Sequence, residues 1–229
     1  MTAHPATHEP PAGARPEKRR AILAGARDVF ARDGFSRASI DAIASAAGVS
    51  TRTIYKHFGD KTALFEAVVI ESSRTVAEAE IAALDAHLGA VSSADDVEGA
   101  LRTFALAWLG ATGRPADDHE LVTHRALIAQ LRTDAAQLPA ELRRAWWADG
   151  PGRVRGALAA VFERWSSRGW IEVEDAPLAA AQFSALVAAV PDPLETDVSD
   201  ATRAKRIAAG VATFVHGVSN RSSSGRRPG

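Results

Sequence analysis

The sequence predicts an all-α protein with about nine helices, arranged as a small three-helix N-terminal domain followed by a larger helical domain. Apolar residues recur at helical spacing along most of the chain, whereas no segment keeps the period-two alternation of a half-buried strand for more than a few residues. Alanine is abundant and tyrosine occurs only once, which also favours helix. With 229 residues, the chain is long enough to bury a substantial core.

The two ends of the chain differ in composition from the segments between them. Residues 1–15 are rich in proline, alanine and histidine, and residues 220–229 are rich in serine, arginine and glycine, so we expect both to be disordered tails. Residues 16–62 then form the N-terminal domain, and residues 63–219 form the larger domain.

The first three helices follow from their apolar spacing and from the residues that end them. Residues 17–33 form the first helix, and Gly34 supplies a left-handed stop. Residues 39–47 form the second helix, which Gly48 breaks, and Ser50 caps a short third helix. The apolar faces of the first two helices are Ile22, Ala26, Val29 and Phe30, then Ile40, Ile43, Ala44 and Ala47.

The remaining chain reads as further helices. Asp60 is the expected N-cap of a long helix that continues to about Leu88, with Leu64, Phe65 and Val68 at the start of its buried stripe. The other expected helices span about 94–112, 118–133, 138–149, 151–168, 176–190 and 199–218.

Composition excludes several classes of protein. Because the chain has no cysteine, it can form neither disulfides nor thiolate zinc sites, and it has no cysteine nucleophile. No apolar run approaches the 18 residues or so that a membrane span needs. The N-terminus lacks the apolar core of a signal peptide, so we expect a cytoplasmic protein without a membrane partner.

The formal net charge of −1 hides an uneven distribution. Residues 16–65 hold nine Lys and Arg against five Asp and Glu, a balance of +4, whereas residues 66–220 carry −8. A basic block on an acidic body indicates a module that binds a polyanion.

The second and third helices suggest which polyanion this is. Two helices joined by a short turn that contains glycine form a helix-turn-helix, whose second helix enters the DNA major groove with its N-terminal residues at the base edges. Here those residues are Thr51, Arg52 and Thr53. Arginine can contact guanine through two hydrogen bonds, and threonine can contact a thymine methyl group or a phosphate. The alternative is a small helical subdomain with a solvated cationic face.

The stretch "GFSRASIDAIASAAGVSTRTIYKHFGDKTALF", residues 34–65, resembles the DNA-binding signature of the TetR family of transcriptional regulators. The glycine–aromatic pair, the "AGVS" turn, the "TIYKHF" helix and the lysine that follows are all present. The resemblance implies phosphate contacts for Tyr55, His57 and Lys61, and base reading or approach for residues 50–53 and Lys56. The complete set of candidate DNA-binding residues is Ser39, Ser50, Thr51, Arg52, Thr53, Tyr55, Lys56, His57 and Lys61.

Residues 131–187 resemble the AefR-like C-terminal region of a subset of these regulators, which implies a dimer. The last two expected helices are the candidate interface, because one is rich in alanine and the other carries an apolar stripe, and two such helices per subunit can form a four-helix bundle. The alternative is that both stripes complete the core of a single chain. The candidate interface residues are Phe183, Ala185, Leu186, Ile207, Val211, Phe214 and Val215.

The middle of the chain is the candidate effector site. Four of the five tryptophans fall between residues 108 and 165, and their large, mostly apolar rings suit a cavity for flat or greasy molecules. The alternative for each tryptophan is ordinary core packing. The candidate pocket residues are Phe104, Trp108, His124, Ile128, Trp146, Trp147 and Trp165. His119 and His124 are five residues apart, on different faces of a helix, so we expect no metal site.

The sequence therefore predicts a dimeric transcriptional regulator that binds a palindromic DNA operator and is released, as a repressor, by a small apolar or aromatic effector of unknown identity. We expect no cofactor and no catalytic residues, because the chain has neither a phosphate-binding glycine loop nor a nucleophile elbow. The competing interpretation is an all-helical enzyme or a scaffold protein with an incidental basic N-terminal subdomain.

Overall fold

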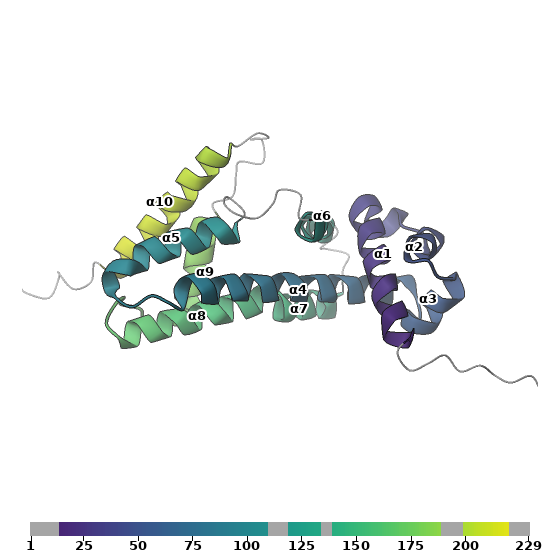
Figure 1. Ribbon diagram of the computed structural model, residues 1–229, viewed down its shortest axis with the longest axis horizontal. Helices are drawn as coiled ribbons and strands as arrows, with labels where there is room; N and C mark the ends of the chain where they lie inside the picture. Colours follow the sequence, from purple (N-terminus) through teal and green to yellow (C-terminus); the bar gives the residue numbers. More distant parts are fainter. Residues whose placement is uncertain (1–13, 110–118, 134–138, 189–198, 220–229) are drawn as a thin grey trace, which may run out of the picture. The chain divides into compact units, whose positions relative to one another are not determined.

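The computed structural model describes residues 14–109, 119–133, 139–188 and 199–219, except for some side chains near the ends of these ranges. Ten α-helices and one short 3-10 helix occupy these ranges, and no strand occurs within them (Figure 1). The predicted all-α class is confirmed. The predicted tails lie outside the described residues, except for residues 14 and 15, which begin the first helix.

The helix bounds are close to those that the sequence predicts. The elements are α1 (Ala14–Arg37), α2 (Ile40–Ala47), α3 (Thr51–Phe58), α4 (Lys61–Leu88), η1 (Ala94–Asp96), α5 (Val97–Trp108), α6 (His119–Thr133), α7 (Ala140–Asp149), α8 (Pro151–Ser167), α9 (Ala176–Val187) and α10 (Asp200–Ser219).

Side-chain caps and left-handed glycines delimit the N-terminal helices. The Ser39 hydroxyl accepts a hydrogen bond from the Ala42 amide at 3.1 Å and starts α2, and Gly48 ends α2 at a φ of 64°. A carboxylate oxygen of Asp60 accepts from the Ala63 amide at 2.8 Å and starts α4. Because these contacts join residues three apart, the local sequence is enough to specify them.

The described helices group into two compact units. The first unit contains α1, α2, α3, α4 up to Ser73, α6, and α7 up to Trp146. The second unit contains α4 from Arg74, η1, α5, the end of α7 from Trp147, α8, α9 and α10. Helix α6 and α7 up to Trp146 thus group with the N-terminal helices, and the predicted domain boundary after residue 62 stays a prediction.

The first unit is built around three phenylalanines. The rings of Phe30 and Phe65 meet edge to face with centroids 5.0 Å apart, and Phe35 lies 4.9 Å from Phe65. Leu127 of α6 and Leu142 of α7 are buried in the same core. These two leucines make α6 and α7 structural parts of the unit that carries α3.

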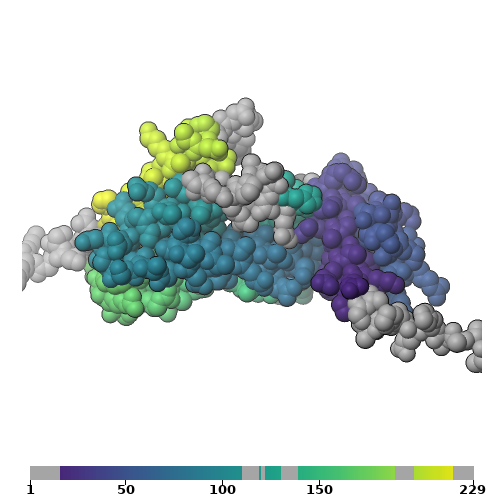
Figure 2. Space-filling model, in the orientation of Figure 1, coloured from purple at the N-terminus to yellow at the C-terminus, as the bar shows by residue number. Residues whose placement is uncertain are grey.

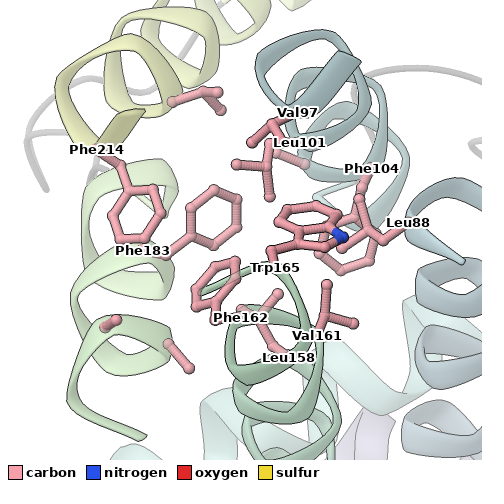
Figure 3. Packing of buried hydrophobic residues seen from close by; sticks show 14 of the residues in the cluster. Leu88, Val97, Leu101, Phe104, Leu158, Val161, Phe162, Trp165, Phe183 and Phe214 are labelled. Atoms are coloured by element: carbon pink, nitrogen blue, oxygen red, sulfur yellow. The ribbon is translucent and has the colours of Figure 1, made fainter. Parts of the chain in front are cut away.

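The second unit has an aromatic core to which α5, α8, α9 and α10 contribute (Figure 3). The ring of Phe162 stacks on Phe214 at 5.1 Å and meets Phe183 edge to face at 5.9 Å. Trp165 and Phe104 are fully buried in this core. Helices α9 and α10 approach closely at Gly210, where an added Cβ would lie 2.4 Å from the Leu186 carbonyl oxygen.

Candidate nucleic-acid interface

Helix α3 has a polar outer face, and one buried residue on its inner face anchors it in the core. Ile54 is 1% exposed and belongs to the core of the first unit, so it fixes the rotation of this short helix. Tyr55 is 51% exposed, and Arg52 and Lys56 are also exposed. One phenol and two cations therefore project from the surface opposite the core.

The first turn of α3 is held by a pair of hydroxyls. The Ser50 hydroxyl accepts from the Thr53 amide at 3.2 Å, and the Ser50 and Thr53 hydroxyls share a hydrogen bond of 2.9 Å. Thr51 and Thr53 are half-buried, which leaves Arg52 as the exposed cation of this turn. Ser50 and Thr53 thus set the geometry from which Arg52 projects.

Lys61 contacts two residues near the C-terminal end of α1. Its ammonium lies 4.7 Å from the centre of the Phe35 ring and donates to the Ser36 carbonyl oxygen at 3.3 Å. The side chain is only partly exposed, at the first residue of α4. Its positive charge and the free N–H groups of the α4 N-terminus are therefore adjacent, which is the arrangement that a phosphate favours.

The basic residues of this unit are not all equally available to contact DNA, because some of them contact other groups of the chain. Arg32 makes two hydrogen bonds to the Asp33 carboxylate, at 2.8 and 2.7 Å, and this interaction lowers the pKa of Asp33. The Arg37 guanidinium donates to the Asp33 carbonyl oxygen at 2.9 Å. His57 is half-buried, with its ring 6.3 Å from that of Phe58.

The predicted effector residues are divided between the two units. Phe104 and Trp165 lie in the core of the second unit, where Trp108 stacks on Phe104 at 5.4 Å. Trp147, also in the second unit, is 42% exposed and lies 4.7 Å from the Arg155 guanidinium. The members in the first unit are His124, Ile128 and Trp146. Their assembly around one cavity stays a prediction.

His124 belongs to a buried polar group on α4 and α6. Its Nδ1 shares a 2.9 Å hydrogen bond with the Ser72 hydroxyl. Burial first, and then the positive charges of Arg125 and Arg27, lower the pKa of His124 from 6.5 to about 4, so the ring is neutral at pH 7.

Sequence reasoning missed the serines of this group. Ser72 and Ser73 are 3% and 2% exposed, and the Ser73 hydroxyl makes no hydrogen bond to any described residue. A serine pair in the middle of an otherwise apolar helical face was the available signal. Buried hydroxyls of this kind can hold a polar group of a ligand.

The predicted dimer residues have two different environments. Phe183, Ile207, Val211 and Phe214 are buried in the core of their own chain, which accounts for them without a partner. Ala185 is exposed, and Leu186 and Val215 are partly exposed.

A groove lies on the outer face of α9 and α10. Its volume is about 530 Å³, and the exposed Leu178 lines it. Other lining residues are Ala185, Leu186, Gly217 and Val218. The outer face of α9 and α10 therefore has exposed apolar surface available for a partner. The four predicted dimer residues that are buried in the core of their own chain have none.

Within the described ranges, no three His, Asp or Glu side chains come together in a way that could hold a metal ion. None of the helices in those ranges combines the length and the apolar character that crossing a membrane requires.

Curated relatives match parts of the chain. The HTH-type transcriptional repressor AcnR of Corynebacterium efficiens is 40% identical over 73 residues, which are 32% of this chain and 37% of AcnR. The DNA-binding transcriptional repressor TetR of Mycobacteroides abscessus is 36% identical over 114 residues, which are 50% of this chain and 52% of that repressor. The chain therefore spans between about a third and about half the length of these relatives.

Solved structures match most of the chain, and two family models match separate parts of it. A TetR-family transcriptional regulator from Mesorhizobium loti is 26% identical with a TM-score of 0.76, over 90% of this chain and 98% of that chain. The flavonoid-responsive regulator FrrA is 28% identical with a TM-score of 0.64, over 90% of this chain and 99% of that chain. Residues 22–68 match the model of the tetR family of bacterial regulatory proteins, and residues 116–217 match that of the AefR-like transcriptional repressor C-terminal domain. The chain belongs to the TetR family of transcriptional regulators, with an AefR-like C-terminal domain.

Proposed function

We propose that this protein is a dimeric repressor that binds a palindromic DNA operator and releases it when a small apolar or aromatic effector binds. The observation that carries the proposal is the outer face of α3, where Arg52, Tyr55 and Lys56 project from a helix anchored by the buried Ile54. A rigid helix with exposed donors on one face matches the width and chemistry of the major groove.

Arg52 is the side chain that reads base sequence in this proposal. It is exposed in the first turn of α3, whose geometry Ser50 and Thr53 hold. The planar guanidinium can donate two hydrogen bonds to one guanine, which gives about 1–3 kcal/mol of discrimination against another base. Tyr55, Lys56 and Lys61 contact phosphates and set the position of α3 on the duplex.

A second copy of the chain covers the outer face of α9 and α10. Leu178 is 53% exposed there, and the groove beside it is lined by apolar and small residues together with the exposed Glu172, Glu174 and Asp175. An apolar centre with a polar rim is typical of protein interfaces. A two-fold symmetric dimer supplies two α3 helices, and a palindromic operator offers them half-sites about 34–36 Å apart.

The effector is proposed to be a flat aromatic molecule. Trp146, which belongs to the same unit as His124, supports this class, and the solved regulator FrrA, which is 28% identical, is flavonoid-responsive. The neutral His124 and the buried hydroxyls of Ser72 and Ser73 could bind hydroxyl groups of such a molecule. An effector that lowers the affinity of the protein for DNA must itself bind the DNA-bound protein more weakly than the free protein, and by the same factor.

The proposal is tested by fluorescence anisotropy with labelled duplexes from the DNA that flanks the protein's own gene. We expect one duplex to bind much more tightly than shuffled DNA, and quercetin, as a flavonoid probe, to release it. Arg52→Ala should lose this preference, whereas Arg102→Ala, which removes an exposed arginine from α5 of the other unit, should keep it. Equal affinity of the wild-type protein for all duplexes would reject the repressor function, and would favour the enzyme or scaffold interpretation.

A further inference from the structure

The second turn of α1 carries three exposed cations, which lie outside α3 and have no part in the base reading proposed for that helix. Lys18, Arg19 and Arg20 are all exposed. None of the three forms an ion pair within the described part of the chain, in contrast to Arg32, which is paired with Asp33. Their charge is therefore not neutralised by an ion pair with any described residue.

Arg19 is held against the end of α3. Its guanidinium carbon lies 5.4 Å from the centre of the ring of Phe58, the last residue of α3. The sequence explains this position, because Arg19 lies three and four residues before the buried Ile22 and Leu23 and so shares the helical face that packs inward. Figure 1 shows the first turns of α1, in the darkest purple, beside α3, and Figure 2 shows the purple and blue surfaces adjoining.

A guanidinium that lies over an aromatic ring keeps its N–H groups available as donors. These N–H groups lie in the plane of the guanidinium, at its edge, and can form paired hydrogen bonds to a phosphate. The ring thus orients Arg19 before any ligand arrives, and less side-chain freedom is lost on binding. Such paired donors fit a phosphate or a carboxylate, and the exposed charges of Lys18 and Arg20 beside Arg19 favour the phosphates of a polyanion.

We propose that Arg19, with Lys18 and Arg20 on either side, binds backbone phosphates of the operator next to the C-terminal end of α3. The proposal rests on the DNA-binding function proposed above. Helix α3 has eight residues and is about 12 Å long, so these phosphates lie well away from the bases read at its first turn. Arg19 therefore adds affinity that does not depend on base sequence and fixes the position of α3 on the duplex.

The experiment measures operator affinity against salt concentration for wild-type protein, Arg19→Ala and Arg19→Lys. One lost phosphate contact in each of two subunits should reduce the slope of log K against log salt by about 1.8 for Arg19→Ala. We expect affinity to fall about tenfold on operator and on shuffled DNA alike, because the contact is to phosphate. Arg19→Lys keeps the charge and should keep most of the slope, but it should bind more weakly because lysine lacks the paired donors.

Arg168→Ala is the matched control, because Arg168 is also an exposed arginine over an aromatic ring, with its guanidinium carbon 4.9 Å from the centre of the Trp170 ring, but belongs to the second unit. It should change neither the slope nor the affinity. A lower melting temperature for Arg19→Ala with an unchanged salt slope would overturn the proposal and leave Arg19 as a purely structural link between α1 and α3.

Failure of the proposed repressor function would give a different result from failure of the role proposed for Arg19. If wild-type protein shows no preference for any operator duplex, the repressor function fails. If the preference exists and Arg52→Ala abolishes it, while Arg19→Ala keeps the wild-type slope, only the role of Arg19 is wrong.

Discussion

Acidification should destabilise this protein through His124. The ring is largely buried on α6 and shares a hydrogen bond with Ser72, and its pKa in the folded protein is lowered from 6.5 to about 4. In the unfolded chain the same ring takes up a proton near pH 6.5. Between pH 6.5 and pH 4 the unfolded state therefore binds more protons than the folded state, so folding stability falls as the pH falls through this window.

The size of the loss follows from the two pKa values. Each unit of pKa difference corresponds to 1.36 kcal/mol, so we expect a loss of about 2 kcal/mol by pH 5 and about 3 kcal/mol by pH 4, relative to pH 7. For a chain of this length, 1 kcal/mol shifts the melting temperature by roughly 2–4 °C. His124 alone should thus lower the melting temperature by about 4–8 °C between pH 7 and pH 5.

The assay compares the wild-type protein with His124→Asn. Asparagine does not titrate, and its side-chain amide can keep a hydrogen bond to Ser72. Melting temperatures by circular dichroism at pH 7, 6 and 5 give the acid sensitivity of each protein, and the difference between the two proteins isolates His124 from other titrating groups. The same variant assigns the His124 ring signal in an NMR titration. Equal acid sensitivity of the two proteins, or a His124 signal that titrates near pH 6.5, would refute the reasoning.

Three further predictions concern DNA binding and assembly. Arg52→Ala should cost about 1–3 kcal/mol on the operator and relax the preference at one base pair per half-site, measured by anisotropy with single-substitution duplexes; an equal loss on random DNA would limit Arg52 to phosphate contact. Lys61→Ala should weaken binding to all sequences and lower the salt slope by about one ion per subunit, and an unchanged slope would reject its phosphate contact. Ala185→Glu should give folded monomers by light scattering, because Ala185 is exposed on the proposed dimer face, whereas Val211→Asp should unfold the second unit, because Val211 is 1% exposed in the core of its own chain. A dimeric Ala185→Glu protein would place the interface elsewhere.

The sequence alone was sufficient where the interactions are local. The bounds of α2 and the start of α4 depend on Ser39, Gly48 and Asp60, which make contacts within a few residues of themselves. The buried face of α3 follows in the same way, because helical spacing places Ile54 opposite Arg52 and Lys56 on the short recognition helix.

The sequence could not say which helices share a core. Leu127 and Leu142 complete the core of the unit that carries α3, although they lie more than 60 residues from it along the chain. Phe183 and Phe214 form a ring contact with each other at 5.2 Å, which explains their burial within one chain, the alternative that the apolar stripes left open beside a dimer.

The sequence predicts the local helix bounds but not which helices share a core, for one physical reason. Spacing along a helix shows that a face is apolar and must be buried, but the hydrophobic effect has no direction, so any apolar face of suitable shape can cover it. Only tertiary packing decides which face does so. The same packing buried His124 of α6 beside Ser72 of α4, 52 residues apart, and this burial is the largest cause of the low pKa of the histidine.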